Sequence, residues 1–346
     1  MSEIRVGLVG YGTAGAVFHA PLIHATPGLN LAAVVTRDPD RAAEVAEKYG
    51  ATAVKDADEL WPRCDLAVIA SPNRTHVPLA TAALNAGRPV VVDKPLARTA
   101  QEARDLVDLA TKKRLMLTVF QNRRWDGDFL TLRRLVAEGA LGDVYRLESR
   151  FERWRPVPKG GWRESGGEDE VGGLLYDLGS HLVDQALQLL GPVREVYAES
   201  DVRREGVSSD DDSFLALTHA NGARSHLWAN ALAAQLGPRF RVLGSAAAYV
   251  KHGLDVQEER LRAGATPHDP GFGADPEEQW GTLGTIDSVE RVRTEPGSYL
   301  DFYQAVAASL STGSAPPVDP RDVVDALTVI EAARRSATEH TVIRIH

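Results

Sequence analysis

A glycine-rich turn near the N-terminus constrains the fold of this chain more than any other feature. Residues 10–15 read Gly-Tyr-Gly-Thr-Ala-Gly, directly after an apolar, strand-like run and before a helical pattern. In a G-x-G-x-x-G turn the first glycine allows a sharp bend, the second lets the backbone approach a pyrophosphate, and the third lets helix and strand pack closely. Free N–H groups and the helix dipole favour an anion there. In this context the pattern predicts a dinucleotide site that uses Gly10, Gly12, Thr13, Ala14 and Gly15.

Strands and helices alternate through the first 120 residues. Near-continuous apolar runs are typical of a parallel sheet covered by helices on both faces, and right-handed crossovers then give a doubly wound arrangement. We therefore expect an N-terminal Rossmann domain, of the α/β class, over residues 1–121. The expected strands are Ile4–Gly10, Leu31–Thr36, Ala51–Val54, Asp65–Ala70, Pro89–Asp93 and Leu115–Phe120, and the expected helices are Pro39–Tyr49, His76–Ala86 and Ala100–Lys113.

The pattern changes after residue 121. Alternating runs such as Phe214–His219, Ala223–Trp228 and Arg239–Leu243 predict a mostly antiparallel sheet with one wet face. Leu174–Leu190 predicts one strong helix, and 320–339 predicts a closing helix that could pack back on the first domain. We therefore expect an α+β domain over residues 122–346 with a large, mostly antiparallel sheet. Its open face, from about residue 210 to 250, would join subunits into a homodimer or homotetramer.

Composition excludes several classes of protein. The chain has 346 residues, a formal net charge of −9 and 43% apolar residues, so wholesale binding of nucleic acid or of an anionic membrane is not expected. It has no apolar stretch of about 20 residues that could span a bilayer. The single cysteine, Cys64, excludes an intrachain disulfide and a Cys-rich metal site, and the scattered histidines predict no metal centre. The default expectation is a cytoplasmic protein.

The end of the second expected strand indicates which cofactor is preferred. An NAD site usually has an acidic residue there for the ribose 2′-hydroxyl. Here Asp38 precedes Pro39, which is an ordinary helix start, so Asp38 is expected to be an N-cap rather than a ribose ligand. Arg37 would then face a 2′-phosphate, with Thr36 as a hydrogen-bond donor. NADP is therefore favoured over NAD; the alternative is that Arg37 is only a solvated surface charge.

Polar residues also follow the fourth and fifth expected strands. Because the carboxyl ends of parallel strands face the ligand crevice, Ser71, Asn73 and His76 are candidate cofactor contacts. Asp93 and Lys94 end the fifth strand at the same edge. A lysine placed there can hydrogen-bond a substrate oxygen and stabilise negative charge that develops on it.

The helix expected over Leu174–Leu190 carries a polar stripe. Asp177 and His181 are four residues apart, so on one continuous helix they would share a face otherwise flanked by leucines. Histidine is suited to moving a proton near neutral pH, and a nearby carboxylate can orient it. The alternative is a buried pair with only a structural role.

These elements together resemble the Gfo/Idh/MocA oxidoreductases. The resemblance rests on Gly10–Gly15, Asp93-Lys94-Pro95 and Asp177-x-x-x-His181 in this order, and it extends over essentially the whole chain. Further stretches, such as Phe18-His19-Ala20-Pro21 and Asn122–Asp126, are similar to the branch that contains NADP-preferring scyllo-inositol dehydrogenases.

The resemblance implies an NAD(P)-dependent enzyme that acts on CH–OH groups, transferring hydride between nicotinamide and a cyclic polyol or sugar. Lys94 would contact the reacting hydroxyl, His181 would accept the proton, and Asp177 would support the site or contact the substrate. The family usually has Glu where this chain has Asp93, which is one methylene shorter, so the contact with the nicotinamide end that the resemblance implies would be weaker or pass through water.

Alternatives remain at the level of the sequence. Candidate substrate contacts, each with a structural role as the alternative, are Asn122, Arg123, Trp125, Arg155, Trp162 and Tyr176. The same scaffold could serve as a non-catalytic NADP-binding sensor or repressor, although such a module needs no acid–base pair. It could also be a dehydrogenase of an aldose or of another small alcohol or carbonyl compound.

Overall fold

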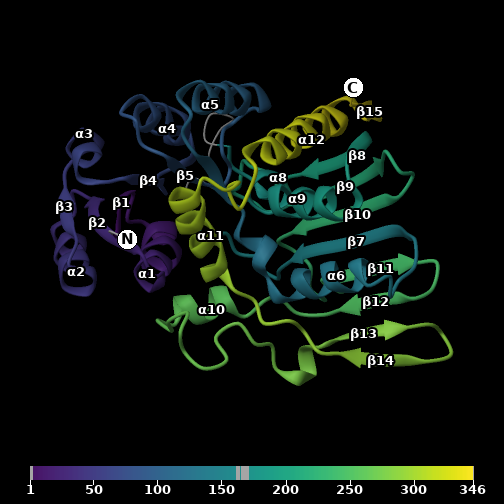
Figure 1. Ribbon diagram of the computed structural model, residues 1–346. Helices are drawn as coiled ribbons and strands as arrows, with labels where there is room; N and C mark the ends of the chain where they lie inside the picture. Colours follow the sequence, from purple (N-terminus) through teal and green to yellow (C-terminus); the bar gives the residue numbers. More distant parts are fainter. Residues whose placement is uncertain (1–2, 161–163, 165–170, 346) are drawn as a thin grey trace. The chain divides into compact units, whose positions relative to one another are not determined.

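The computed structural model describes residues 3–160, 164 and 171–345. The chain forms two compact units (Figure 1). The first comprises Met1–Trp125, Val256–Gly273 and Ser298–Val324, and the second comprises Asp126–Asp255, Ala274–Gly297 and Asp325–His346. The first unit thus includes two segments from far beyond residue 121. Within the described part of the chain, no helix has both the length and the apolar character of a membrane span.

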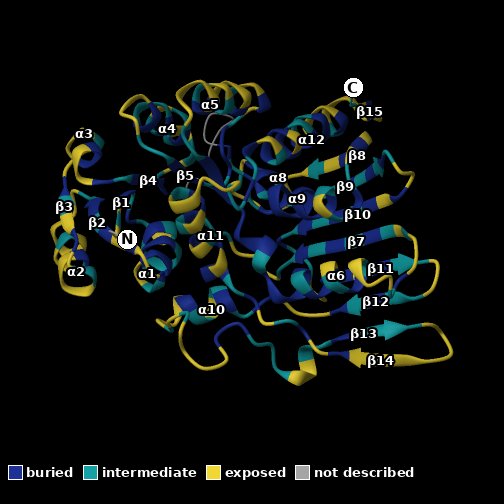
Figure 2. Ribbon diagram, viewed as in Figure 1, coloured by how far each residue is buried: buried dark blue, intermediate teal, exposed yellow. Residues whose placement is uncertain are grey.

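The first unit is built on a parallel six-stranded sheet in the order β3-β2-β1-β4-β5-β6. This is the doubly wound dinucleotide-binding order, and it confirms the expected Rossmann domain. Figure 2 shows that the central strands of this sheet are mostly buried, and their buried residues are almost wholly apolar, as expected of a parallel sheet with helices on both faces. The strands are β1 (Ile4–Val9), β2 (Leu29–Val35), β3 (Thr52–Val54), β4 (Leu66–Ile69), β5 (Val90–Asp93) and β6 (Leu117–Phe120).

The helices of the first unit begin and end at residues suited to those positions. The Asp38 carboxylate accepts hydrogen bonds from the N–H groups of Asp40 and Arg41, with Pro39 next in the chain, which confirms Asp38 as an N-cap. The helical segments are η1 (Ala14–His19), α1 (Ala20–Ala25), α2 (Pro39–Tyr49), α3 (Ala57–Leu60), η2 (Trp61–Arg63), η3 (Asn73–Thr75), α4 (His76–Asn85), α5 (Ala100–Lys113), η4 (Asn122–Trp125), α10 (Gln257–Arg262) and α11 (Tyr299–Thr312).

The second unit contains a nine-stranded sheet in the order β14-β13-β12-β11-β7-β10-β9-β8-β15. Apart from the parallel pair β7 and β10, the described neighbours are antiparallel, which confirms the expected mostly antiparallel sheet. Its strands are β7 (Val144–Glu152), β8 (Val193–Asp201), β9 (Asp212–His219), β10 (Arg224–Asn230), β11 (Phe240–Gly244), β12 (Ala248–Lys251), β13 (Gly281–Gly284), β14 (Val289–Val292) and β15 (Ile343–Arg344).

Helices of the second unit pack on one face of this sheet: α6 (Gly127–Ala137), α8 (Leu174–Asp177), α9 (Gly179–Leu190) and α12 (Pro320–Glu339), the last of which begins in the first unit. The prediction of one helix over Leu174–Leu190 is wrong. The helix is interrupted at Leu178: α8 ends at Asp177 and α9 begins at Gly179. The His181 N–H donates to the Leu178 carbonyl at this interruption. Leucines are buried on both sides of the break, so the apolar periodicity runs through it unchanged.

A buried arginine ties α6 and α9 to the sheet. Arg239, 2% exposed, donates to the Ser149 hydroxyl at 2.5 Å and to the Gln185 side chain at 2.7 Å, and its Nε lies 3.3 Å from Asp128 Oδ2. Its guanidinium also lies 4.0 Å from the ring centre of Phe151. The charge is thus held between an aromatic face and a carboxylate, out of reach of water.

This cluster predicts a large cost for losing the arginine. Arg239→Met should lower the free energy of unfolding by about 3–5 kcal/mol, because it leaves the Asp128 carboxylate buried without its cation. Adding Asp128→Asn should recover part of that loss. Arg241, two residues after Arg239, forms an ion pair with Glu148 and is half-exposed. Arg241→Met should therefore lower the free energy of unfolding by less than about 1 kcal/mol. The free energy of unfolding of the wild-type protein and the three variants can be measured by urea denaturation. Equal losses for Arg239→Met and Arg241→Met would contradict the stabilising role of the buried Arg239.

Candidate functional site

The glycine turn has the geometry of a phosphate cradle. Gly10 has φ +100°, and a Cβ there would lie 2.7 Å from the Ala70 carbonyl oxygen. A Cβ on Gly15 would collide with the Gly10 carbonyl oxygen, whereas a Cβ on Gly12 would meet nothing within 4 Å. The first and third glycines are therefore required by packing, and the second leaves open space on the ligand side. Thr13 and Ala14 follow at the start of η1, a wide π-helical segment, a kind often found at functional sites.

After β2 the Asp38 carboxylate is engaged in a helix cap, and the Arg37 side chain is exposed. Asp38 is engaged in capping α2 and lies 3.5 Å from Arg41. The Thr36 hydroxyl accepts the Asp38 N–H at 3.3 Å. Arg37 is exposed, and its Nε donates to the Lys55 carbonyl just beyond β3. This contact holds the arginine at the carboxyl edge of the sheet through Nε alone.

The loop after β4 is held by His76. Its Nε2 lies 2.8 Å from the Ser71 carbonyl oxygen and its Nδ1 lies 2.7 Å from the Pro95 carbonyl oxygen. Because carbonyl oxygens only accept, both contacts are hydrogen bonds only when both ring nitrogens carry a hydrogen, as in imidazolium. His76 is 1% exposed, so its ring links two loops rather than offering a nitrogen to a cofactor. Ser71, paired with the Thr75 hydroxyl, and Asn73, the first residue of η3, remain at the edge.

Asp93 and Lys94 lie at the carboxyl end of β5, as expected. Asp93 Oδ1 accepts the backbone N–H of Lys94 at 2.9 Å and lies 3.8 Å from His19 Nε2. Burial acts to raise the pKa of Asp93, but His19, with His76 and Lys94, outweighs burial, so the pKa lies below its usual value. The carboxylate is therefore ionised and is oriented by its neighbours. The half-buried Lys94 follows it directly.

The segment after β6 is used mainly within the first unit. Arg123 donates to Glu258 at 2.5 Å and to the Tyr299 hydroxyl at 3.3 Å, and this cation, with Arg262, holds the pKa of Glu258 below its usual value against the opposing effect of burial. The Trp125 ring lies 5.5 Å from that of Phe302. For these two residues the contacts favour the structural alternative. Asn122, also a candidate, is buried in η4.

The second unit carries the candidate acid–base pair. Asp177 is the last residue of α8, and its carbonyl accepts the Ser180 hydroxyl at 3.4 Å. His181 is buried in the first turn of α9, with its ring 6.4 Å from that of Phe151. The two residues are thus on two short helices joined at Leu178, rather than on one continuous helix face.

Asp210, which the sequence analysis did not single out, positions α8. Its Oδ2 accepts the Leu175 N–H at 2.7 Å and the Ser213 hydroxyl at 2.8 Å, and its carbonyl accepts the Leu174 N–H. Burial raises the pKa of Asp210 although these donors oppose it. Asp210 thus satisfies two N–H groups at the start of α8, where a helix lacks internal acceptors: its carbonyl accepts that of Leu174 and its carboxylate that of Leu175.

The remaining candidates are dispersed. Arg155 is exposed after β7, and its carbonyl accepts Arg204 at 3.3 Å. Tyr176 is buried in α8, burial raises its pKa, and the Arg334 guanidinium lies 5.7 Å from its ring centre. Trp162 lies outside the described residues. No group of three or more potential metal ligands occurs in the part of the chain that the structure describes.

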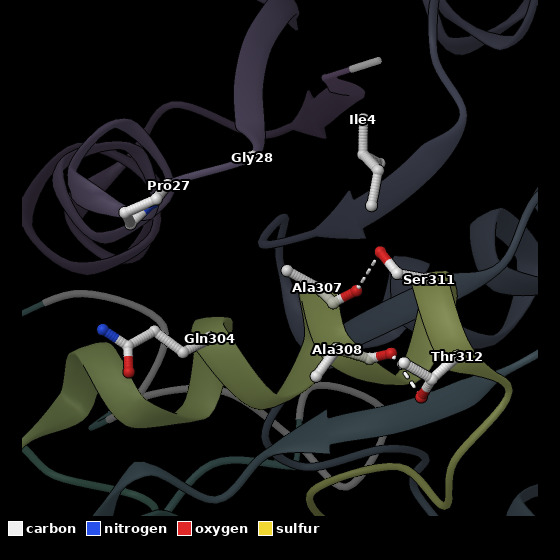
Figure 3. Close-up of a pocket in the computed structure, with 8 residues that line it drawn as sticks. All are labelled: Ile4, Pro27, Gly28, Gln304, Ala307, Ala308, Ser311 and Thr312. Atoms are coloured by element: carbon white, nitrogen blue, oxygen red, sulfur yellow. Dashed lines mark hydrogen bonds between the residues drawn. The ribbon is translucent and has the colours of Figure 1, made fainter. Parts of the chain in front are cut away.

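A pocket of about 460 Å³ in the first unit lies elsewhere (Figure 3). It is lined by Ile4 and Gly28 on one side and by residues of α11, such as Gln304 and Ala308, on the other. Ile4 begins β1 and Gly28 directly precedes β2, so this pocket is at the amino ends of the strands. Dinucleotides bind at the carboxyl ends, so the pocket is not the candidate cofactor site.

Comparison with known proteins covers both units. Residues 4–121 match the family model described as the oxidoreductase family, NAD-binding Rossmann fold (GFO_IDH_MocA), and residues 133–345 match its C-terminal alpha/beta domain. The chain is 42% identical over 341 residues to the uncharacterized oxidoreductase YdgJ of Escherichia coli strain K12, covering 97% of this chain and 96% of that protein.

Two further relatives come from Bacillus subtilis. The chain is 36% identical over 352 residues to the scyllo-inositol 2-dehydrogenase (NADP(+)) IolW of strain 168, covering 100% of this chain and 97% of IolW. The structure of this chain is similar to that of the putative oxidoreductase yvaA from Bacillus subtilis. The TM-score is 0.95 and the identity 35%, with 100% of this chain and 99% of that chain covered. Family models and relatives agree along the whole chain: the protein belongs to the Gfo/Idh/MocA oxidoreductase family.

Proposed function

We propose that the protein is an NADP-preferring dehydrogenase of a cyclic polyol or sugar, with Lys94 and His181 as its catalytic residues. The observation that carries the proposal is the pair of features at one edge of the Rossmann sheet. The open, glycine-required turn suits a dinucleotide pyrophosphate, and Lys94 follows β5 at the same carboxyl edge. The full-length similarity to a protein named as an inositol dehydrogenase supports the choice of substrate class.

The residues present fit a bound dinucleotide. Gly12 leaves the room that the pyrophosphate needs, and the N–H groups after it lie at the start of a helical segment. When bound, the nicotinamide would accept or return the hydride of the substrate carbon. The residues of this chain would position that carbon, stabilise the negative charge that develops on its oxygen, and take or return the proton of that oxygen.

Each catalytic residue has a separate proposed role. The Lys94 ammonium would hydrogen-bond the reacting oxygen and stabilise negative charge that develops on it. His181 would take the hydroxyl proton on oxidation and return it on reduction. Asp177, two residues before the start of α9, would orient His181 or bind a neighbouring substrate hydroxyl. Asp210, by fixing α8, would keep Asp177 in place.

NADP preference is supported by the residues after β2. The Asp38 carboxylate caps α2 through Oδ1 and lies 3.5 Å from Arg41 through Oδ2, whereas the exposed Arg37 is held at the end of the sheet by a hydrogen bond from its Nε. A guanidinium pairs well with a phosphate group.

We also propose that the open face of the nine-stranded sheet joins copies of this chain. Alternate residues of β9 and β10 place the Phe214, His226 and Trp228 rings together on that face, and the Arg150 guanidinium lies 3.9 Å over the Trp228 ring. Aromatic and arginine side chains of this kind are typical of interface centres.

The first prediction concerns turnover. In a screen of NADP⁺ reduction against inositols and common sugars, the wild-type protein should oxidise at least one cyclic polyol. Lys94→Met and His181→Asn should each lower kcat by about 10²–10⁴-fold, because each removes stabilisation that is specific to the transition state. Calorimetry should show nearly unchanged NADP⁺ affinity.

Matched controls are available for both changes. Lys112→Met in α5 and His340→Asn, both at exposed positions, remove the same chemical groups elsewhere and should leave kcat unchanged. Stoichiometric NADP⁺ binding with no turnover on any polyol, sugar or keto-sugar would reject the enzyme in favour of a sensor.

The second prediction concerns the cofactor. Arg37→Ala should raise KM for NADP⁺ by about 10–100-fold, the loss expected for a charge-assisted hydrogen bond, and should change KM for NAD⁺ little. Arg63→Ala, which removes an exposed guanidinium in η2, before the amino end of β4, is the control. An equal effect on both cofactors, or on neither, would contradict recognition of the 2′-phosphate by Arg37.

The third prediction concerns assembly. Wild-type protein should sediment as a dimer or tetramer, and Trp228→Glu should shift it to the monomer, because a carboxylate would be buried at the centre of the interface. Ile286→Glu, at the exposed turn between β13 and β14, should leave the mass unchanged. A monomeric wild-type protein would end this part of the proposal.

A further inference from the structure

A buried chain of polar side chains lies behind Asp93 in the first unit. His19, at the end of η1, is 0% exposed, and its Nδ1 lies 2.6 Å from the Tyr303 hydroxyl of α11. Its Nε2 lies 3.8 Å from Asp93 Oδ1 and has no hydrogen-bond partner among the described residues. The His19 ring is held by Phe120, with ring centres 4.6 Å apart. A buried ring nitrogen that makes no hydrogen bond costs free energy, so its position facing Asp93 calls for an explanation.

The direction of the hydrogen bonds follows from the acceptors available. Burial, with Asp93, raises the pKa of Tyr303 well above its usual value, so the phenol keeps its proton. If the phenol donates to Nδ1, then Nε2 carries the hydrogen and points it toward the carboxylate. In the opposite tautomer the Nε2 lone pair would face the ionised Asp93, and Nδ1–H would donate to the phenol oxygen. The first arrangement is electrostatically favourable and the second is repulsive.

The chain ends on the backbone of Lys94. Asp93 Oδ1, the oxygen nearest His19, also accepts the Lys94 N–H. On the other side of Lys94, the Pro95 carbonyl is held by His76. Contacts that involve the two buried histidines thus hold the backbone on either side of Lys94: Asp93, which faces His19, accepts the Lys94 N–H, and His76 contacts the carbonyl of the next residue, Pro95.

We propose that His19 and Tyr303 are positioning residues for Lys94: Tyr303 fixes the tautomer of His19, whose Nε2–H orients the Asp93 carboxylate and, through it, the Lys94 backbone. The proposal rests on the function proposed above for Lys94.

The tautomer can be observed without cofactor or substrate. In protein labelled with ¹⁵N-histidine, NMR should show a hydrogen on His19 Nε2, with the His19 signals assigned by their loss in His19→Phe. Tyr303→Phe, which removes only the donor to Nδ1, should shift His19 toward a mixture of tautomers. A His19 found as the Nδ1–H form in the wild-type protein would overturn the proposal.

Kinetics test the positioning itself. Tyr303→Phe should lower kcat about fivefold, the effect of one hydrogen bond, and His19→Phe should lower it at least tenfold, with KM for NADP⁺ changed less than about twofold in both. His19→Gln, which keeps a donor near the Nε2 position, should recover part of the loss. Tyr249→Phe removes a buried hydroxyl that has no partner among the described residues, and it should leave kcat unchanged.

The outcomes separate this proposal from the function of Lys94. If Lys94→Met abolishes turnover while folded Tyr303→Phe and His19→Phe keep wild-type kcat, the positioning chain is rejected and the catalytic role stands. If Lys94→Met keeps full activity, the proposed function fails first. Should His19→Phe lose its thermal unfolding transition, Tyr303→Phe and His19→Gln decide the matter, since both keep the packing volume nearly intact.

Discussion

The close approach of backbone to backbone at the first βα turn is the constraint on which the rest of the structure depends. Gly10 lies against the carbonyl of Ala70, and Gly15 lies against the carbonyl of Gly10, with no room for a side chain at either position. This packing joins the ends of β1 and β4 to the start of η1. Between these two packed glycines, a Cβ on Gly12 would meet nothing within 4 Å, so the backbone of the turn is open at that position. Replacing either packed glycine would move the strands whose ends carry the polar residues discussed above.

Charged residues lie at the carboxyl edge of the parallel sheet, after β2 and at the end of β5. Asp38 caps α2, and the neighbouring Arg37, proposed above to bind the cofactor, donates through Nε to the Lys55 carbonyl. After β5 the ionised Asp93 is surrounded by His19, His76 and the Lys94 backbone. Buried carboxylates are costly unless they are paired, so these partners explain how Asp93 remains ionised next to the proposed catalytic lysine. The same neighbours restrict where the lysine backbone can lie.

Much of this could be predicted from the sequence because the signals are local. The glycine turn, the Asp38–Pro39 helix start and the alternation of β9 and β10 each depend on residues within one element. These local signals also predict where the strands end, and therefore that Lys94 directly follows β5 at the carboxyl edge of the sheet. The break at Leu178 could not be seen, because leucines on both sides are buried and continue one apolar period.

Other features depend on contacts between distant parts of the chain. His19, Asp93 and Tyr303 come from η1, β5 and α11, and no local pattern links them. The pairing of Arg123 with Glu258, which turns a candidate substrate contact into an internal ion pair, has the same origin. Asp210 could not be predicted from the sequence, because it lies in a loop and accepts a hydrogen bond from Leu175 of α8, more than 30 residues earlier in the chain.

The most direct test of the central claim is a crystal structure of the protein with NADP⁺ and a cyclic polyol that it oxidises. We expect the Lys94 ammonium and a His181 ring nitrogen both to lie within hydrogen-bond distance of one substrate hydroxyl, on the carbon that faces the nicotinamide. A complex in which either side chain points away from that hydroxyl would contradict it.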